Sequence, residues 1–366
     1  MHDQLLILEA PAAGVRLAIC VVPLLSREAA RRHDLEDGSA GALAQGLAAS
    51  LLLAATDRPD DPPKARVDLQ LECSGPLRGM LIDADGHGAV RGLVRVNGLD
   101  RAGQRSDPPA PGSAQSRDRH RDLAERADRA EAATEAGKLF SGASAAPGLQ
   151  LAAVSPPGTS ATGLLRFDAR ALLGGGGDGP AGMLSVLRAA PGEEELHRAT
   201  VPFAGHDIAA GISAFLRTDR RLAGELALEV LYSPGEPLAA VAGAMVLPIT
   251  EEEREVARDF GERLRDGELH RLLSATDRQA PGNAHALAQA VTASLGLGPL
   301  RLESELRLRF SCRCSRERVV RALQTLGREE LQRMAEEDGG AEATCDFCAQ
   351  TYRIAGPELV GLPGDQ

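Results

Sequence analysis

The chain has 366 residues, 43% of them hydrophobic and 2% aromatic, with no Trp and a formal net charge of −11. This length allows two domains with a real core, whereas the acidic charge and the scarcity of aromatic stacking platforms argue against a nucleic-acid-binding protein. Asp3 and Glu9 lie where a secretory signal needs basic and then apolar residues, so the sequence predicts a cytoplasmic protein.

The first hundred residues predict a mixed α and β segment, with a strand over residues 15–25 and a helix over residues 38–56. The helix is uncharged and long enough to be weighed as a membrane span. It contains polar residues, however, and Leu43, Leu47 and Leu51 recur every four residues, as on the buried face of a helix in a globular domain. We therefore expect no membrane association. A hairpin or meander is expected over residues 67–96, with turns at residues 74–76 and 85–86.

Residues 101–162 differ from the rest, because Pro, Ser, Ala, Gly and charged residues dominate them, apart from one possible helix over residues 121–139. This composition offers too little apolar surface to offset the entropy of ordering, so it predicts a flexible insertion. Strands at residues 182–189, 199–204, 226–233 and 238–249 and a helix at 207–216 are expected to complete the sheet. The predicted fold class is α+β, with a mixed β-sheet core domain over residues 1–249.

Residues 250–300 predict a helical linker that is marginally stable by itself. Three glutamates at 251–253 open a strongly charged helix, and a second helix follows the break at Pro281-Gly282. Isolated helices of this length are barely stable in water, so the linker needs a partner surface. The apolar positions that would meet this surface are Val256, Phe260, Leu264, Leu269 and Leu272.

Residues 301–366, the expected C-terminal domain, contain four of the six cysteines as two pairs, Cys312 with Cys314 and Cys345 with Cys348. Residues 307–314 are extended in character, so the side chains of the first pair point to the same side. C-x-x-C is the usual chelate of zinc ribbons, and four thiolates can close a tetrahedral shell around one Zn²⁺. A closed shell leaves no position for a reactive water, so the predicted site is structural and not hydrolytic.

The segment between the pairs predicts two helices with a small apolar face. Ser315 is a plausible N-cap, Gly327 ends the first helix, and the second ends near residue 339. So few apolar residues would struggle to fold alone, and structural zinc in small peptides contributes roughly 10–16 kcal/mol. The residues leave two interpretations open: an inert zinc knuckle, or a redox switch in which oxidation of the thiolates, favoured by Arg313, Arg316 and Arg318, releases the metal and unfolds the domain.

The run CRCSRERVVRALQTLGREEL, followed by CDFCAQTY, closely resembles the zinc-binding tail of the thirty-three-kilodalton heat-shock protein family, the redox-regulated holdase chaperones. LQLECSGPLRGMLIDADGHGAVRG is similar to the family's N-terminal sheet, and GHDIAAGISAFL to the helix after its later strands. The resemblance implies a reduced, inactive form with zinc on all four cysteines. It also implies an oxidised form in which Cys312 pairs with Cys314 and Cys345 with Cys348. The linker would then lose structure, and the protein would dimerise and hold unfolding clients without ATP.

Two other classes remain open: a zinc-ribbon protein that binds nucleic acid or a transcription complex, and a thiol–disulfide oxidoreductase. Residues 301–366 hold ten Arg against twelve acidic residues, which counts against the first. The CDFC motif lies in an apparent strand knuckle and not at a helix start, which counts against the second.

The remaining motifs carry little chemistry, and we predict that the protein is not an enzyme. Gly174, Gly176 and Gly179 satisfy G-x-G-x-x-G but precede a proline and not a helix. Cys20 and Cys73 are expected to be packed thiols. Of the scattered histidines, His206 and His270 would be metal ligands only by coincidence of folding.

Overall fold

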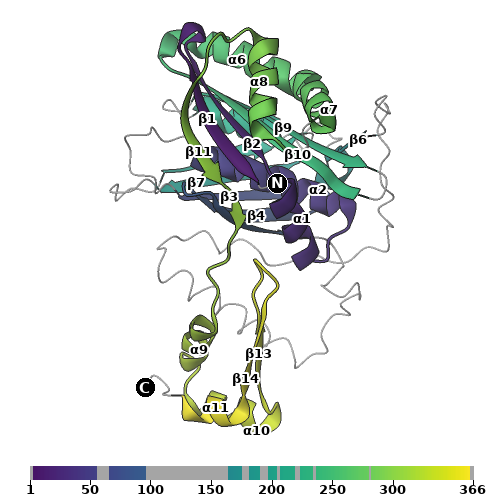
Figure 1. Ribbon diagram of the computed structural model, residues 1–366. Coiled ribbons are helices and arrows are strands. Elements are labelled where there is room, and N and C mark those ends of the chain that lie inside the picture. Colours follow the sequence, from purple (N-terminus) through teal and green to yellow (C-terminus); the bar gives the residue numbers. More distant parts are fainter. Residues whose placement is uncertain are drawn as a thin grey trace. The chain divides into compact units, whose positions relative to one another are not determined.

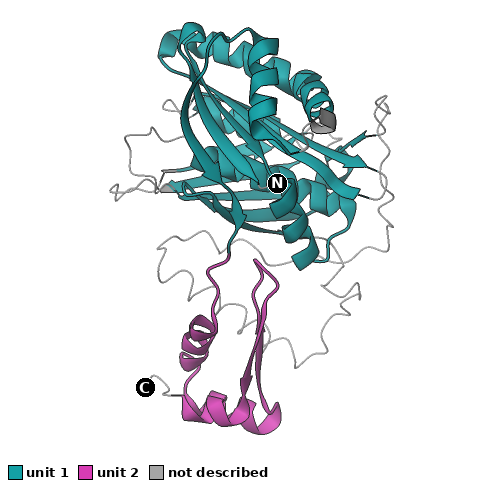
Figure 2. Cartoon of the chain, viewed as in Figure 1, with its two compact units in different colours: residues 1–97, 149–311 teal, residues 98–148, 312–366 magenta. Residues whose placement is uncertain are grey.

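The structure is a computed structural model that describes residues 3–55, 66–95, 164–174, 181–189, 197–203, 207–218, 223–233, 236–279 and 282–362. The chain divides into two compact units (Figure 2). Unit 1 comprises residues 1–97 with 149–311, and unit 2 comprises residues 98–148 with 312–366. Each unit is considered separately.

Unit 1 contains two six-stranded sheets (Figure 1). The first sheet is antiparallel, in the order β11-β1-β2-β10-β9-β6. Its strands are β1 Gln4–Ala10, β2 Val15–Val21, β6 Leu165–Arg166, β9 Glu225–Ser233, β10 Glu236–Pro248 and β11 Arg301–Arg307. The second sheet has the order β12-β5-β4-β3-β7-β8 and is mixed, because β12 runs parallel to β5. Its strands are β3 Arg66–Cys73, β4 Gly79–Asp85, β5 Ala89–Arg95, β7 Gly182–Ala189, β8 His197–Phe203 and β12 Arg309–Phe310.

Helix α2, Asp37–Ala54, lies between the two sheets and packs on both. Leu43 and Leu47 are buried as expected, but so is nearly every other residue of the helix, because sheets cover it on two sides. Close packing needs small residues here: a Cβ added at Gly46 would lie 2.3 Å from Ile82 Cδ1. None of the described helices is long and apolar enough to cross a membrane. The other helices of this layer are α1 Pro23–Arg32 and α5 Ile208–Thr218, and unit 1 also contains η1 Pro11–Ala13 and α4 Arg170–Leu173.

The linker helices cover the opposite face of the first sheet (Figure 1). They are η2 Glu251–Glu253, α6 Arg254–Arg263, the π-helical turn η3 Leu264–Glu268, α7 Leu269–Gln279 and α8 Ala284–Leu295. Leu264, Leu269 and Leu272 are buried in the apolar cluster shared with this sheet, which confirms the partner surface expected for them. Val256 is exposed and Phe260 only partly buried. From here on, "the linker" means η2 to α8.

Unit 2 is small, and its described part contains a hairpin and three helices. These elements are α9 Arg316–Gln324, α10 Arg328–Glu337, β13 Gly340–Thr344, β14 Thr351–Ala355 and α11 Gly356–Gly361. Ser315 is the predicted N-cap of α9, since its Oγ accepts a hydrogen bond from the Arg318 N–H at 3.3 Å. The buried core is Leu323, Leu331, Met334, Ile354 and Leu359. So small a core agrees with the expectation that the unit needs additional stabilisation.

The structure departs from the sequence expectations at three places. The strand expected over residues 15–25 ends at Val21, because Pro23 begins α1. The core has two sheets where one was expected. Residues 301–310, expected in the zinc domain, include β11 and β12, which pair with β1 and β5 of unit 1. The insertion at residues 101–162 and its helix lie outside the described residues. The functional boundaries expected at residues 249 and 300 stay predictions.

Candidate metal centre

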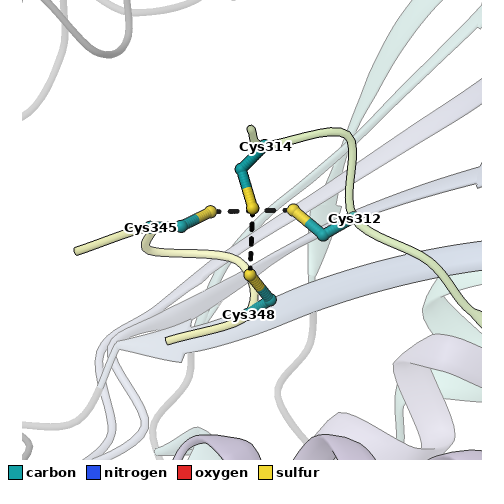
Figure 3. Close-up of side chains that lie close together, drawn as sticks. All are labelled: Cys312, Cys314, Cys345 and Cys348. Atoms are coloured by element: carbon teal, nitrogen blue, oxygen red, sulfur yellow. Dashed lines mark hydrogen bonds between the residues drawn. The ribbon is translucent and has the colours of Figure 1, made fainter. Parts of the chain in front are cut away.

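Two segments of unit 2 bring the four cysteines together (Figure 3). Cys312 and Cys314 lie in the extended stretch before α9, and Cys345 and Cys348 lie in the turn between β13 and β14. All four Sγ atoms lie within 4.8 Å of one another. The Cys312 and Cys345 sulfurs are 3.6 Å apart and the Cys314 and Cys348 sulfurs 3.3 Å apart, so contacts join one pair to the other. The spacing in the sequence therefore predicted a cluster that the fold does assemble.

The C-x-x-C turn is fixed by the backbone of the hairpin. The Cys345 N–H donates to the Gln350 carbonyl at 2.9 Å, and the Ala349 N–H donates to the Cys345 carbonyl at 2.8 Å. Ala349 has a φ of +57°, in the left-handed region that reverses the chain tightly. This turn directs the Cys345 and Cys348 sulfurs toward the first pair (Figure 3).

The sulfur geometry fits a tetrahedral thiophilic cation. With Zn–S bonds of about 2.3 Å, the edges of a tetrahedron of sulfurs measure about 3.8 Å. The two measured separations, 3.6 and 3.3 Å, lie slightly below this value, and the others stay within 4.8 Å. All four cysteines are free thiols and none forms a disulfide. Small movements of the side chains would therefore complete a four-sulfur shell.

Crowding of the sulfurs opposes their ionisation. Hydrogen bonding with Cys312, followed by Cys348 and by burial, raises the pKa of the Cys345 thiol far above its ordinary value. The hydrogen bond with Cys312 is also the largest cause that raises the pKa of Cys348, to about 12. Four thiols this close cannot all become thiolates unless a cation compensates the charge. The donor set therefore suits a bound divalent metal.

Tyr352, on β14, contacts the cluster through its hydroxyl. The phenol O–H donates a hydrogen bond to Cys314 Sγ at 3.1 Å. Burial, followed by the neighbouring sulfur, raises the pKa of Tyr352, so the hydroxyl remains a donor at neutral pH. Sequence reasoning missed this residue. The sequence could have pointed to it, because one of only two tyrosines in the chain lies four residues after Cys348.

One of the three arginines expected to favour the thiolate form has another partner. The Arg316 guanidinium makes two bonds of 2.5 Å to the Glu358 carboxylate on α11. Its charge is therefore balanced within unit 2 and contributes less to the sulfurs than the sequence suggested.

A second polar arrangement, in unit 1, holds the linker against β9. Glu225 of β9 is buried and accepts hydrogen bonds from Arg217 Nε at 2.6 Å and from Arg265 Nη1 at 2.9 Å. Arg265 belongs to η3 and also donates to Ser213 Oγ at 2.9 Å. Burial raises the pKa of the Glu225 carboxyl, but the two guanidinium groups outweigh it and the net pKa is lowered.

Glu229, four residues further along β9, forms a second buried contact with the linker. It accepts a hydrogen bond from Arg166 Nε at 3.0 Å, and His270 Nδ1 of α7 lies 3.4 Å from its Oε1. His270 is therefore a linker contact and not a metal ligand, and His206 lies outside the described residues. The sequence did contain a sign of these contacts. Two glutamates lie four residues apart in the apolar strand ELALEVLYS, so they share one face and must have partners when buried.

The other motifs are structural where they are described. Cys20 is buried and donates to the Ala48 carbonyl at 3.8 Å, and burial raises the pKa of its thiol to about 12. Cys73 is buried too, which raises its pKa to about 11. Both are packed thiols of unit 1, as expected. Gly174 caps α4 with a φ of +83°, while Gly176 and Gly179 lie outside the described residues.

Comparison with known proteins gives one consistent family. A model of the family described as "Hsp33 protein" matches residues 3–355. The 33 kDa chaperonin of Acaryochloris marina is 28% identical, with 100% of this chain and 98% of the relative covered. That of Synechocystis is 29% identical, with 100% and 97% covered. The crystal structure of the 33 kDa chaperonin from Thermotoga maritima has a TM-score of 0.59 at 18% identity, with 99% of this chain and 98% of that chain covered, which shows a shared fold.

Proposed function

The chain belongs to the Hsp33 family, a family of chaperonins and not of enzymes, and we propose on that premise that it is a redox-regulated, ATP-independent holdase. One observation carries the proposal: four cysteine sulfurs from two distant segments lie within 4.8 Å of one another, in a unit with a very small core. Such a cluster can hold a fold together while reduced and release it when oxidised.

In the reduced state, Cys312, Cys314, Cys345 and Cys348 would hold one Zn²⁺ as four thiolates. The metal supplies positive charge that keeps the sulfurs ionised, and it ties the hairpin of unit 2 to the segment before α9. Without this tie, the five-residue core is left to hold the unit. The reduced form is the inactive one in this proposal.

Oxidation would convert the four thiolates to two disulfides. Each peroxide takes two electrons from one pair of thiolates and, with two protons, becomes two waters while one S–S bond forms. We propose the pairs implied by the family resemblance, Cys312 with Cys314 and Cys345 with Cys348. Disulfide sulfurs bind zinc poorly, so the four cysteines would no longer hold the metal and unit 2 would lose its main source of stability.

The activity itself would arise in unit 1, where the linker covers an apolar sheet face. Leu6, Leu8, Leu17, Ile19 and Val246 are all 6% exposed or less beneath it. The cover is weakly anchored at its start, because α6 buries only Ala257 and Gly261 among its ten residues. When the linker loses its helices, this sheet face becomes available to apolar segments of unfolding proteins.

The partners in this proposal are unfolded or aggregation-prone client proteins in the cytoplasm. An exposed sheet face of this kind also favours self-association, so we propose a homodimer after oxidation. The core over residues 1–249, the linker over 250–300 and the redox domain over 301–366 would then have distinct roles, although β11 and β12 pack with the core.

The test compares the full-length protein before and after peroxide with mild heating. Zinc content and suppression of aggregation of a denatured client are measured on the same samples. We expect one zinc per chain and little suppression in the reduced form, and metal loss with strong suppression after oxidation. Equal suppression by the reduced, zinc-loaded form would refute the redox switch.

Cysteine variants test the ligand assignment. Replacing Cys312 and Cys345 with Ser should lower zinc affinity and unfold unit 2, because two of four thiolates are lost. Cys73→Ala is the matched control, since it removes a thiol of unit 1 that lies outside the cluster. Retention of one tightly bound zinc by the double variant contradicts the assignment. Turnover of insulin disulfides at a thioredoxin-like rate would instead favour the oxidoreductase, and salt-dependent nucleic-acid binding the zinc-ribbon alternative.

A further inference from the structure

The cysteine cluster has two arms, the segment with Cys312 and Cys314 and the hairpin with Cys345 and Cys348, and Tyr352 of the hairpin hydrogen-bonds to Cys314. We infer that it is a positioning residue for the Cys314 sulfur and that its hydroxyl sets how readily the cluster gives up its metal. The inference rests on the proposed function, because it concerns the retention and oxidative release of the proposed zinc.

The hairpin fixes where the hydroxyl lies. Tyr352 is on β14 opposite Ala343 of β13, one residue beyond the paired hydroxyls of Thr344 and Thr351, which are 3.1 Å apart. Its ring is half-buried, and its hydroxyl reaches Cys314 Sγ at 3.1 Å. Tyr352 therefore belongs to the arm that carries Cys345 and Cys348 but bonds to a sulfur of the other arm.

This hydrogen bond has two chemical effects on Cys314. A phenol O–H that donates to a thiolate withdraws electron density from the sulfur and so lowers its nucleophilicity toward peroxide. The bond also fixes the orientation of the Cys314 side chain, which reduces the entropy lost when the fourth ligand closes the shell. The first effect slows oxidative loss of the metal, and the second favours the closed shell. Loss of a residue that supports a ligand typically costs 10- to 100-fold in metal affinity.

Tyr352→Phe in the full-length protein removes the hydroxyl and keeps the ring. We expect zinc affinity, measured by chelator competition, to fall roughly tenfold. Zinc release driven by peroxide, followed with a chromogenic chelator, should become faster. In the cobalt-substituted protein, the sulfur-to-cobalt charge-transfer band should shift to lower energy, because a sulfur without a hydrogen bond is a better electron donor. A merely structural role would not move this band.

Thr351→Val is the matched control, because it removes a hydroxyl from the adjacent position of β14 that bonds to Thr344 and not to sulfur. It should leave the band and the release rate as in the wild type. The inference is overturned if Tyr352→Phe behaves like Thr351→Val in all three measurements while the wild type still binds zinc and is activated by oxidation. A wild-type chain that binds no zinc, or is fully active when reduced, fails the proposed function and the inference together.

A second substitution covers the case in which Tyr352→Phe does not fold. Only two tyrosines occur in the chain, so uniform replacement by 3-fluorotyrosine changes little else. The fluorinated phenol is more acidic and therefore a stronger hydrogen-bond donor. We expect slower zinc release and a charge-transfer band at higher energy. An unchanged band and release rate in the fluorinated protein would overturn it.

Discussion

The buried contact between Arg265 and Glu225 predicts how firmly the linker is docked. Replacing Arg265 with Met keeps an unbranched apolar side chain but removes the charged guanidinium group. The lost bonds are those to Glu225 Oε2 at 2.9 Å, to Ser213 Oγ at 2.9 Å and to the Leu226 carbonyl at 3.3 Å. Arg265 is 15% exposed and Glu225 2% exposed, so solvent screens this pair little.

The free-energy cost of the substitution depends on the partners that Glu225 retains. Breaking a buried pair costs about 3–5 kcal/mol when the other charge is left alone. Glu225 retains Arg217, so we expect a smaller cost of about 2–3 kcal/mol, which comes mainly from the lost charge-assisted hydrogen bonds. This corresponds to a roughly 30- to 150-fold weaker docking equilibrium. The reduced protein should then hold clients in part without oxidation.

Hydrogen exchange of the α6 and α7 amides in the reduced, zinc-loaded protein measures this change directly. Arg258→Met is the matched control on α6, because Arg258 is 48% exposed and pairs only with an 80% exposed Glu255 among the ion pairs of the described residues. It should change docking by less than about 0.5 kcal/mol. Equal exchange in the two variants would refute the reasoning that buried charge anchors the linker.

Three further changes test other parts of the molecule. Ala349→Val places a β-branched residue at a φ of +57° and should lower zinc affinity, measured by chelator competition, roughly 5- to 30-fold. Ala355→Val, at a φ of −71°, is the control and should leave the affinity unchanged, and equal affinities of the two variants would contradict the prediction. Burial raises the pKa of Asp68 to about 6, so its charge costs stability increasingly as pH rises from about 4 to 6. Asp68→Asn should therefore raise the melting temperature at pH 7 but not at about pH 4, and an equal gain at both would count against it. Gly261→Ala would place a Cβ 2.1 Å from Glu225 Cβ, so α6 should lift from β9 and exchange faster; unchanged exchange would show that the helix can shift at no cost.

Much of the fold could be predicted because periodicity and turn residues report local structure. The meander over residues 67–96 appears as β3, β4 and β5, and the strands at 182–189 and 226–233 as β7 and β9. The number of sheets could not be predicted, because pairing joins strands far apart in the chain. β11 illustrates this: none of its residues is buried, and only its pairing with β1 makes it a strand of the first sheet.

The cysteine cluster could be predicted because chelate spacing is a local property of each pair, and four thiols share one chemistry. The contact of Tyr352 with the cluster could not be predicted, because it depends on the direction in which this strand residue points from the hairpin. Glu225 and Arg265 are forty residues apart, and nothing local in the sequence pairs them. Contacts of this kind are set by tertiary packing.

The placement of β11 has a consequence for reversibility. The linker leaves the first sheet at β10 and returns to it at β11, so both its ends belong to one sheet. An unfolded linker is therefore a closed loop tethered over the surface it has uncovered, at an effective local concentration of about millimolar order. Clients of the proposed holdase would therefore compete with this tethered segment for the same surface. In the proposed mechanism, once reduction had restored unit 2, re-docking of the loop would displace a bound client without any external energy source.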